Sequence, residues 1–428
     1  MQTFLRNNFD LHLAGFSARI PAAAWAIWIF SVTLFPYVYL LTRAFLKNQS
    51  AALFENALLL GGGRLRLFLR VGLPLLWPSA TAGMTLACLE VLNDFGVSSY
   101  YGLNTFTTAI FAAWFGMGDA DTAVKLAGIL LALVLLILLA RKAMHNARRY
   151  HIVSSKEKRL TPQRARGRAQ AAIIALCGAA CLTGFILPAL QLFYWLSLTW
   201  EDAFTSDIQR ALGYTLLVAG LATCSVMIAA AGTVNAGRMF GGRLAAMRAQ
   251  ATTIGYSIPS AVLAVGVISL FTKADRLLGA IMLSHPGMLL SMSSAMLIFA
   301  YAVRFFSIGY QAVESGFAKT GMIYAEVSRT LGRGVTSTFF LVELPLVRHA
   351  VLSGAALVFI DIIKELPLSL LLRPFNTETL GTTAYHFANN EVLEETALPS
   401  LCIILAGAVF ILLTQVWEKR EKKYVPAH

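Results

Sequence analysis

The segment ENALLLGGGRLRLFLRVGLP, residues 55–74, recurs in altered form as EVSRTLGRGVTSTFFLVELP, residues 326–345. Five of the positions shared by the two copies define the pattern, and their spacing is the same in both. They are Glu55, Gly61, Val71, Leu73 and Pro74 in the first copy, and Glu326, Gly332, Val342, Leu344 and Pro345 in the second. Each copy is charged and amphipathic, and each precedes a long apolar run. The pattern therefore predicts a segment held between membrane spans and suited to docking on a partner outside the bilayer.

Composition sets the class of protein. The chain has 428 residues, of which 57% are hydrophobic and only 13% charged, whereas a soluble protein carries about 25% charged residues. Several apolar segments reach roughly 20 residues, enough to cross about 30 Å of hydrocarbon. We predict an all-α polytopic membrane protein with about nine transmembrane helices. The expected spans are 22–45, 79–99, 123–141, 171–196, 211–236, 252–271, 286–309, 349–371 and 396–417.

The net charge of +13 is unevenly distributed, and its pattern predicts the orientation in the membrane. Residues 141–168 hold ten Lys and Arg residues and a single acid, Glu157. We interpret this run as a solvated loop, so no nucleic-acid partner is expected. Basic segments alternate along the chain with acidic ones, and basic loops stay in the cytoplasm. The acidic segments are predicted to face outward, among them the one with Glu378, Glu391, Glu394 and Glu395. Both copies of the repeated segment are therefore predicted to face the cytoplasm.

The repeat extends beyond the opening segment. At the offset that relates Glu55 to Glu326, Gly83 matches Gly354, Glu90 matches Asp361, and Asp94 matches Glu365. With a four-residue insertion, residues 107–109 match residues 382–384, both reading TTA. Both copies run in the same membrane direction, so we predict a parallel repeat of two halves with a pathway between them. The expected divisions are a first half at 1–150, a basic linker at 151–170, a second half at 171–418 and a cytoplasmic tail at 419–428.

The two predicted halves are unequal. One expected helix precedes the first copy of the repeated segment, whereas four lie between residue 171 and the second copy. The first half thus lacks about three helices at its start. The expectation is an N-terminally shortened chain, through an internal start or a truncated gene.

Glycine and proline predict the local structure of each copy. In each copy, the residues between the glutamate and the glycine are expected to form a short helix. Gly61 in the first copy and Gly332 in the second are expected to end it, because glycine adopts positive φ freely. Pro74 and Pro345 fit the start of the next spanning helix. The expected result is a short cytoplasmic helix joined rigidly to a transmembrane helix.

This E-x5-G-x9-[IV]-x-LP pattern resembles the EAA loop of binding-protein-dependent ABC importer permeases. The stretch VFIDIIKELPLSLLLRPFNTETLGTTAYHF, residues 358–387, resembles the ferric-iron subgroup with two fused halves. The resemblance covers about residues 21–420. It departs from the family at Asn56, Val327 and Ser328, where the family favours alanines.

The resemblance implies partners and coupling residues. Each loop would form a coupling helix docked on one of two ABC ATPase subunits, and a periplasmic binding protein would deliver the substrate. The protein would lie in a bacterial inner membrane, with ATP bound by the partner ATPase rather than by this chain. The coupling residues carried over are Glu55, Ala57, Gly61, Leu73 and Pro74, and Glu326, Gly332, Leu344 and Pro345.

Charged residues inside the predicted spans form a second candidate site. Glu90, Asn93 and Asp94 share one helical face, and Asp361, Lys364 and Glu365 repeat that arrangement. Charges at this depth are costly, so they face protein or water. Two interpretations stay open: a polar lining of the translocation pathway, or a structural network such as Asp361 with Lys364.

Several kinds of chemistry have no support in the sequence. The seven histidines are scattered, and the five cysteines lie in apolar stretches, so no resident metal is expected. No GxxxxGK[ST] loop and no catalytic constellation occurs. We therefore expect a transport subunit and not an enzyme.

The favoured function is the permease of an ATP-driven importer, with ferric iron first among substrates. Thiamine or phosphonate is the alternative cargo. A secondary transporter driven by an ion gradient is another class, with Glu90, Asp94, Asp361 and Glu365 as proton carriers. A third is an incomplete remnant or scaffold subunit that needs a companion permease.

Overall fold

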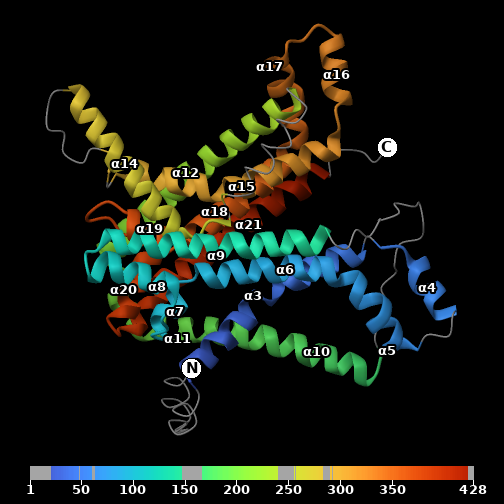
Figure 1. Ribbon diagram of the computed structural model, residues 1–428, viewed down its shortest axis with the longest axis horizontal. Helices are drawn as coiled ribbons and strands as arrows, with labels where there is room; N and C mark the ends of the chain where they lie inside the picture. Colours follow the sequence, from blue (N-terminus) through green and yellow to red (C-terminus); the bar gives the residue numbers. More distant parts are fainter. Residues whose placement is uncertain are drawn as a thin grey trace. The chain divides into compact units, whose positions relative to one another are not determined.

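The computed structural model describes residues 21–47, 49–59, 63–146, 166–239, 255, 257–282, 290–291 and 293–422. All elements of this part of the chain are helices (Figure 1), which confirms the predicted all-α class. The chain divides into two compact units, one of residues 1–112 with 128–191 and the other of 113–127 with 192–428. The three boundaries fall inside the π turn η2 (Ala112–Gly116), α9 (Ala120–Asn146) and α11 (Leu187–Ala203). The expected division into permease halves at residues 150 and 171 stays a prediction.

Eight helices of the described chain are long and apolar enough to cross a membrane. They are Ala22–Lys47, Leu65–Asn93, Ala120–Met144, Arg168–Glu201, Ser206–Arg238, Ser294–Thr320, Val335–Ile363 and Leu393–Trp417. The ninth expected span, 252–271, is not among them. Its place is taken by α14 (Ser260–Met282), whose second half carries Lys273, Asp275 and Arg276. These three charges make α14 too polar to meet the same criterion.

The first unit is built around one long helical rod. The rod consists of α5 (Arg64–Leu67), a π turn η1 (Phe68–Gly72) and α6 (Leu73–Asn93). The unit also contains α3 (Ala22–Lys47), α4 (Ala51–Leu59), α7 (Gly96–Tyr100), α8 (Phe106–Phe111), α10 (Arg168–Cys181) and the π turn η3 (Leu182–Ile186). Helix α3 packs on α6. A Cβ at Gly83 of α6 would lie 2.5 Å from Cα of Val38 in α3, so only glycine permits this approach.

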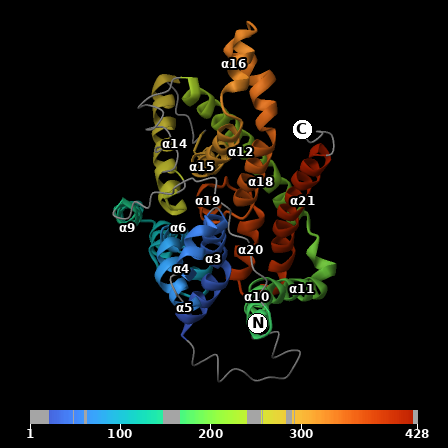
Figure 2. The same cartoon turned by 90° about the vertical axis from the view of Figure 1, so that its right-hand side faces the viewer.

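The second unit holds the larger set of helices. They are α12 (Ser206–Met239), α14, α15 (Ser294–Thr320), α16 (Ile323–Thr330), α17 (Val335–Thr338), the π turn η4 (Phe339–Glu343), α18 (Leu344–Ile363), α19 (Pro367–Leu372), α20 (Leu380–Asn389), the 3₁₀ turn η5 (Leu393–Thr396) and α21 (Ala397–Lys422). Helices α12, α15 and α18 pack on one another, and α21 packs on α18 (Figures 1 and 2).

The core of the second unit lies where α12, α15 and α18 meet. Helix α12 contributes buried residues every fourth position, which places them on one face; they are Val218, Ala222, Val226, Ala230 and Val234. Glycines let the helices approach closely. A Cβ at Gly354 of α18 would lie 2.6 Å from the Cβ of Ala312 in α15. Small residues at crossings are the usual way in which membrane helices pack tightly.

The sequence repeat is also a structural repeat. The π turns η1 and η4 occupy residues 68–72 and 339–343, which are equivalent positions in the two copies of the sequence motif. In both turns the residue before the proline donates to the carbonyl five residues back, Leu73 to Phe68 and Leu344 to Phe339. Gly83 and Gly354, matched in the sequence, mark equivalent crossings of α3 with α6 and of α15 with α18. The repeat is therefore present in the backbone of both units, and its parallel orientation in the membrane stays a prediction.

The prolines lie where the sequence predicts, because Pro74 and Pro345 are in the first turn of α6 and of α18. Each of these helices also continues backwards through a π turn, so the rod of α5, η1 and α6 begins at Arg64, and the second rod, of α17, η4 and α18, begins at Val335. A proline inside a helix removes one backbone donor and crowds the preceding turn. The wider π turn just before each proline accommodates this, so the helix continues through it.

The register of the repeat also differs from expectation after the acids. Thr105 and Thr108 form a reciprocal capping box at the start of α8, and Thr379 and Thr382 form the same box at α20. Thr108 is therefore equivalent to Thr382. When the starts of α8 and α20 are aligned, the second unit has an insertion of three residues. The alignment of the two TTA sequences had suggested four.

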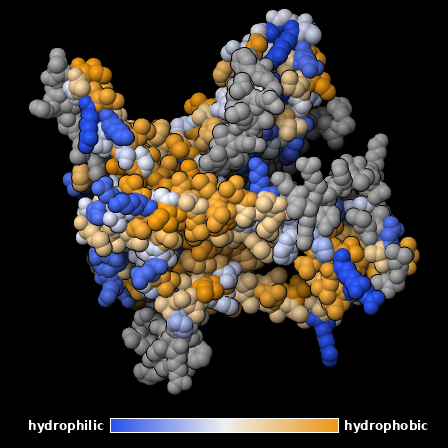
Figure 3. All heavy atoms as spheres, viewed as in Figure 1, coloured by the Kyte–Doolittle hydropathy of each residue, from blue (hydrophilic) through white to orange (hydrophobic). Residues whose placement is uncertain are grey.

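Apolar side chains cover much of the outer surface, as a bilayer requires. Helix α10 has no buried residue, and Ile174, Leu176 and Phe185 of its span are between 61% and 74% exposed. Figure 3 shows mainly apolar side chains over the faces of α6 and α9. Such a surface is suited to contact with lipid or with other apolar helices rather than with water.

Candidate functional site

The second copy of the repeated segment forms a helix that extends beyond the core of its unit. Figures 1 and 2 both show α16 beyond the ends of α12, α15 and α18. Its buried face is small, consisting of Ala325 and Ser328. The other face is apolar and exposed, with Ile323 at 69%, Val327 at 53% and Leu331 at 78%. Glu326 is also exposed. The helix thus offers a partner an apolar surface with an acid beside it.

Gly332 ends α16 as the sequence predicts. Its φ is +84°, in the left-handed region that favours glycine. The N–H of Gly332 donates to the carbonyl of Arg329, and the N–H of Arg333 donates to that of Ser328. These two bonds form a Schellman motif. The reversal then leads directly into α17 and the long rod, with Leu344 and Pro345 following the π turn.

The exposed helix is tied to its neighbours by specific contacts. The hydroxyls of Ser328 in α16 and Thr338 in α17 lie 3.0 Å apart in a buried position. The rings of Phe317 and Phe339 stack with centroids 6.3 Å apart, which joins the end of α15 to the π turn. Segment 321–343 is thus linked internally and to α15.

Arg238 at the end of α12 makes two contacts with segment 321–343 and one with Phe317 of α15. Its Nη1 donates to Oε1 of Glu343 at 2.6 Å, and its Nη2 donates to the carbonyl of Gly321 at 2.9 Å. Its guanidinium lies over the ring of Phe317, 4.5 Å from the centroid. The side chains of Arg238 and Glu343 are only 19% and 8% exposed. This is a largely buried ion pair, which the sequence analysis missed.

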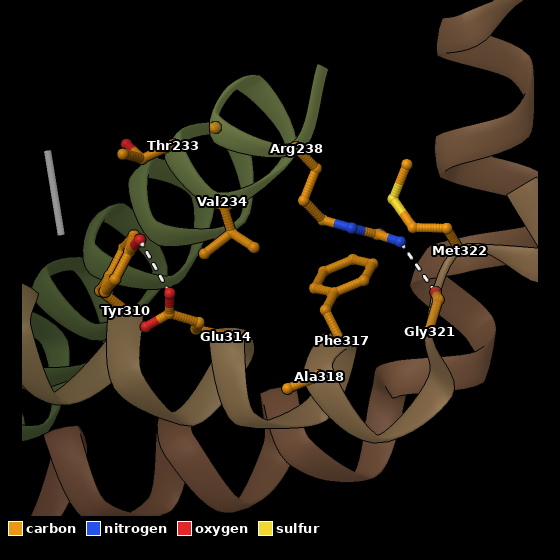
Figure 4. A pocket seen from close by; sticks show the side chains of 10 residues that line it. Thr233, Val234, Arg238, Tyr310, Glu314, Phe317, Ala318, Gly321 and Met322 are labelled. Carbon is orange, nitrogen blue, oxygen red and sulfur yellow. Dashed lines mark hydrogen bonds between the residues drawn. The ribbon is translucent and has the colours of Figure 1, made fainter. Parts of the chain in front are cut away.

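A cavity of about 330 Å³ lies beside this ion pair (Figure 4). Arg238, Phe317, Gly321 and Met322 line one part of it, and Tyr310 and Glu314 line another. The hydroxyl of Tyr310 donates to Oε1 of Glu314 at 3.3 Å. The junction between α15 and α16 therefore borders on open space rather than on packed side chains.

The structure describes only part of the first copy of the repeated segment. Glu55 and Ala57 lie in α4, where Glu55 is exposed and Ala57 half-buried. Leu58 and Leu59 beside them are 48% and 85% exposed. Gly61 lies outside the described residues, so its role as the helix end stays a prediction. Leu73 and Pro74 lie within the rod, immediately after the π turn.

In the first unit, the predicted acids lie at the end of α6. Glu90 and Asn93 are half-buried in its last turns. Asp94 follows, where the backbone becomes extended, and its Oδ2 accepts hydrogen bonds from the N–H and hydroxyl of Ser98 at 2.9 and 3.1 Å. Its carbonyl accepts the hydroxyl of Thr107 at 2.6 Å. Asp94 thus binds the first turn of α7 and links it to α8.

In the second unit, the equivalent acid Glu365 is buried in a polar network. Its Oε1 accepts the hydroxyl of Ser260 at 2.6 Å and the N–H of Leu368 at 3.3 Å. Its Oε2 lies 3.7 Å from Nε of Arg304. Arg304 in turn donates from Nη1 to the carbonyl of Ile258 at 3.0 Å. The contacts of Asp94 and Glu365 favour the structural interpretation for these two acids.

The partner of Glu365 is therefore Arg304, a residue that the sequence analysis did not single out. The sequence does contain an indication of this role, because Arg304 is the single cation within the apolar run 294–313. A charged residue in such a run normally has a partner. Asp361 pairs with Lys364 as the network interpretation expects, with Oδ1 and Nζ 2.7 Å apart. That pair is more open, since Lys364 is 56% exposed and Asp361 23%. The first predicted set, Glu90, Asn93 and Asp94, belongs to the first unit, and the second set, Asp361, Lys364 and Glu365, belongs to the second unit.

A further polar cluster joins α19 to α20, on the side predicted to face outward. Arg373 contacts the carboxylate of Glu378, the carbonyl of Thr377 and, at 3.2 Å, Nε2 of His386. Within the described residues, no group of three or more His, Cys, Asp or Glu side chains is arranged to hold a metal ion. The cluster orders a loop, and the guanidinium at its centre disfavours a cation there.

Comparison with known proteins places these features in context. Residues 12–150 and 228–420 match the family model described as binding-protein-dependent transport system inner membrane component. The chain is also similar to the Fe(3+)-transport system permease protein FbpB 2 of Haemophilus influenzae. The two are 23% identical over 412 residues, which cover 92% of this chain and 77% of the relative.

Proposed function

The chain belongs to the family of binding-protein-dependent transport system inner membrane components, and from this premise we propose that it is the permease of an ATP-driven ferric-iron importer. The cargo is inferred from the Fe(3+)-transport relative and from the resemblance of residues 358–387. ATP is hydrolysed on separate subunits, two of which dock on this chain, one at α4 and one at α16. A periplasmic binding protein delivers the iron, and the membrane is a bacterial inner membrane.

The exposed face of α16 is the observation that carries this proposal. Ile323, Val327 and Leu331 present apolar surface on a helix only eight residues long. The helix is too short to cross a bilayer, and it carries Glu326 and Arg329, with Arg333 just beyond its end. An apolar patch rimmed by charges is typical of a protein interface. A soluble partner on the cytoplasmic side fits this surface better than lipid does.

The contacts around α16 support a coupling mechanism. Closure of two ATPase subunits on ATP displaces the docked helices. Because α16 is linked to α17 through Ser328 and Thr338, and α17 continues into α18 through the π turn, the displacement moves a complete transmembrane rod. The equivalent rod of α5, η1 and α6 serves the first copy. Movement of the two rods opens the pathway alternately to either side.

The pathway itself is lined in this proposal by the less enclosed polar residues. Glu90 and Asn93 are half-buried, and the Asp361–Lys364 pair is open on the Lys364 side. Carboxylate oxygens attract a highly charged cation, whose passage needs weak and transient contacts rather than a closed site. Asp94 and Glu365 contribute through their contacts with neighbouring helices. Iron is thus a substrate that passes and not a resident group.

Replacement of one exposed apolar residue on α16 tests the docking. Leu331→Asp is expected to abolish co-purification of the ATPase and ATP-dependent iron uptake, because a charge replaces apolar surface at the interface. Phe375→Asp is the matched control, since both side chains are 78% exposed and Phe375 lies on the side predicted to face outward. Equal loss of ATPase binding in both variants, or in neither, contradicts the proposal.

The substrate is tested separately. Membrane vesicles that contain the chain with its ATPase and binding protein are supplied with ferric iron, thiamine or a phosphonate. We expect ATP-dependent accumulation of iron alone. ATP-dependent accumulation of thiamine or of the phosphonate instead would support the proposed transport mechanism and contradict the proposed cargo. Uptake driven by a proton gradient without ATP identifies a secondary transporter.

A further inference from the structure

We propose that Arg238 acts as a clamp that makes the second coupling helix move together with α12, and that the first coupling helix has no such clamp. This inference rests on the proposed function, because it concerns how motion at α16 reaches the membrane helices. Arg238 is a positioning residue, since it acts through the helices that it joins.

The clamp holds both ends of the segment that contains α16. Gly321 precedes the helix and has a φ of +70°, and Glu343 closes the π turn that follows α17. Arg238 donates to the carbonyl of the first residue and to the carboxylate of the second. One guanidinium thereby spans the entrance and the exit of the 321–343 segment. Its planar fork allows two such contacts at once, which a lysine cannot reproduce.

The contacts are positioned to carry force. Helix α12 packs on both α15 and α18 within the second unit, so a shift of its end is passed to both. Figure 4 shows the Arg238 side chain extending from α12 across Phe317 to Gly321. The cavity beside Phe317 and Met322 leaves space at this junction. Without the ion pair, α16 could therefore tilt about Gly321 while α12 stays in place.

The first copy of the segment carries other residues at the positions that form these contacts in the second copy. In the register of the repeat, Gly72 stands in place of Glu343, so the first π turn has no carboxylate. Ala57 and Leu67 stand in place of Ser328 and Thr338, so the hydroxyl pair is also missing. The two coupling helices are thus not mechanically equivalent. The second is stiff and drives α12, whereas the first moves its rod alone.

The coupling ratio of the complex tests the clamp. In proteoliposomes with ATPase and binding protein, Arg238→Lys and Glu343→Gln are expected to raise the ATP hydrolysed per iron ion transported by at least about fivefold, the lower end for coupling between sites. ATPase binding should persist, because the docking face of α16 is unchanged. The double variant Arg238→Glu with Glu343→Arg should bring the ATP hydrolysed per iron ion part of the way back to the wild-type value. Arg210→Gln is the control on the same helix, because its pair with Asp207 is exposed on both sides.

Hydrogen exchange on the permease alone gives a second readout that needs no ATPase. Amides of residues 323–331 should exchange faster in Arg238→Lys than in the wild type, and at the wild-type rate in Arg210→Gln. Unchanged exchange together with an unchanged coupling ratio overturns the clamp. Failure of the wild-type chain to bind any ATPase overturns the proposed function instead, and the exchange result then decides the clamp by itself.

Discussion

Arg304 and Glu365 face each other inside the second unit, with Nε and Oε2 3.7 Å apart and side chains only 5% and 8% exposed. They lie on α15 and at the end of α18, so the pair joins two helices that are separate in sequence. Glu365 also accepts from Ser260 at the start of α14. A single carboxylate thus connects three helices at the point where α18 ends.

Removal of the cation should destabilise the second unit strongly. Arg304→Met leaves the Glu365 carboxylate buried without its counter-charge, and breaking such a pair costs about 3–5 kcal/mol. Thermal or denaturant unfolding of the purified protein measures the loss. Arg210→Met serves as the control, because exposed pairs contribute about 0–1 kcal/mol. Equal stability of the two variants contradicts the prediction.

One buried acid of the second unit and one half-buried acid of the first unit should behave differently when neutralised. Glu365→Gln is expected to lower stability while uptake per folded molecule stays near the wild-type value, because Glu365 holds helices together. Glu90→Gln should reduce iron uptake severalfold with little loss of stability, because Glu90 is half-buried and assigned to the pathway. Uptake assays and unfolding curves on the same preparations separate the two effects. Normal uptake by Glu90→Gln removes that residue from the proposed pathway.

Close helix packing makes Gly354 sensitive to the smallest substitution. In Gly354→Ala the new Cβ would lie 2.6 Å from the Cβ of Ala312, so α15 and α18 must separate. Overpacking of this kind costs about 1–3 kcal/mol. Gly407→Ala on α21 is the control, since its Cβ would meet Ile360 at an ordinary 3.7 Å. A lower unfolding temperature is expected for the first variant and not for the second.

The stability contributed by Asp119 should depend on pH. Its carboxylate accepts hydrogen bonds from the hydroxyl and the N–H of Thr122, at 2.5 and 3.0 Å, and these bonds lower the pKa of Asp119. A lowered folded-state pKa means that the stabilisation is complete above the unfolded value of about 3.9 and is lost as pH falls through the folded value. Asp119→Ala should therefore unfold at a lower temperature than the wild type at pH 7. The difference should shrink as the pH falls below 4, and a constant difference contradicts the assignment.

Patterns that depend on neighbouring residues were predictable from the sequence. Long apolar runs gave the all-α class and eight of the nine expected spans, and Gly332 gave the end of α16 because few residues adopt positive φ. The repeat that relates Glu55 to Glu326 led directly to equivalent helices. Lys273, Asp275 and Arg276 explain why the ninth expected span does not meet the same standard in α14.

Contacts between distant residues were not predictable in the same way. Arg238 and Glu343 are 105 residues apart, and their pairing depends on how α12 packs beside α15 and α18. The Asp361–Lys364 pair was expected because its members are three residues apart on one helix. The π turns were not predicted, since they depend on the effect of a proline on the backbone of a continuous helical rod.

The π turn η4 also fixes the rotational setting of α16, the proposed docking helix of the second unit. An α-helix rotates by about 100° per residue, and a π turn amounts to one extra residue in the rod. Loss of a single residue from Phe339–Glu343 would return that turn to α geometry and swing α16 by roughly that angle about the axis of α18. The apolar face of Val327 and Leu331 would then point away from its partner. A single-residue deletion here is thus expected to disconnect a fully folded permease from its ATPase.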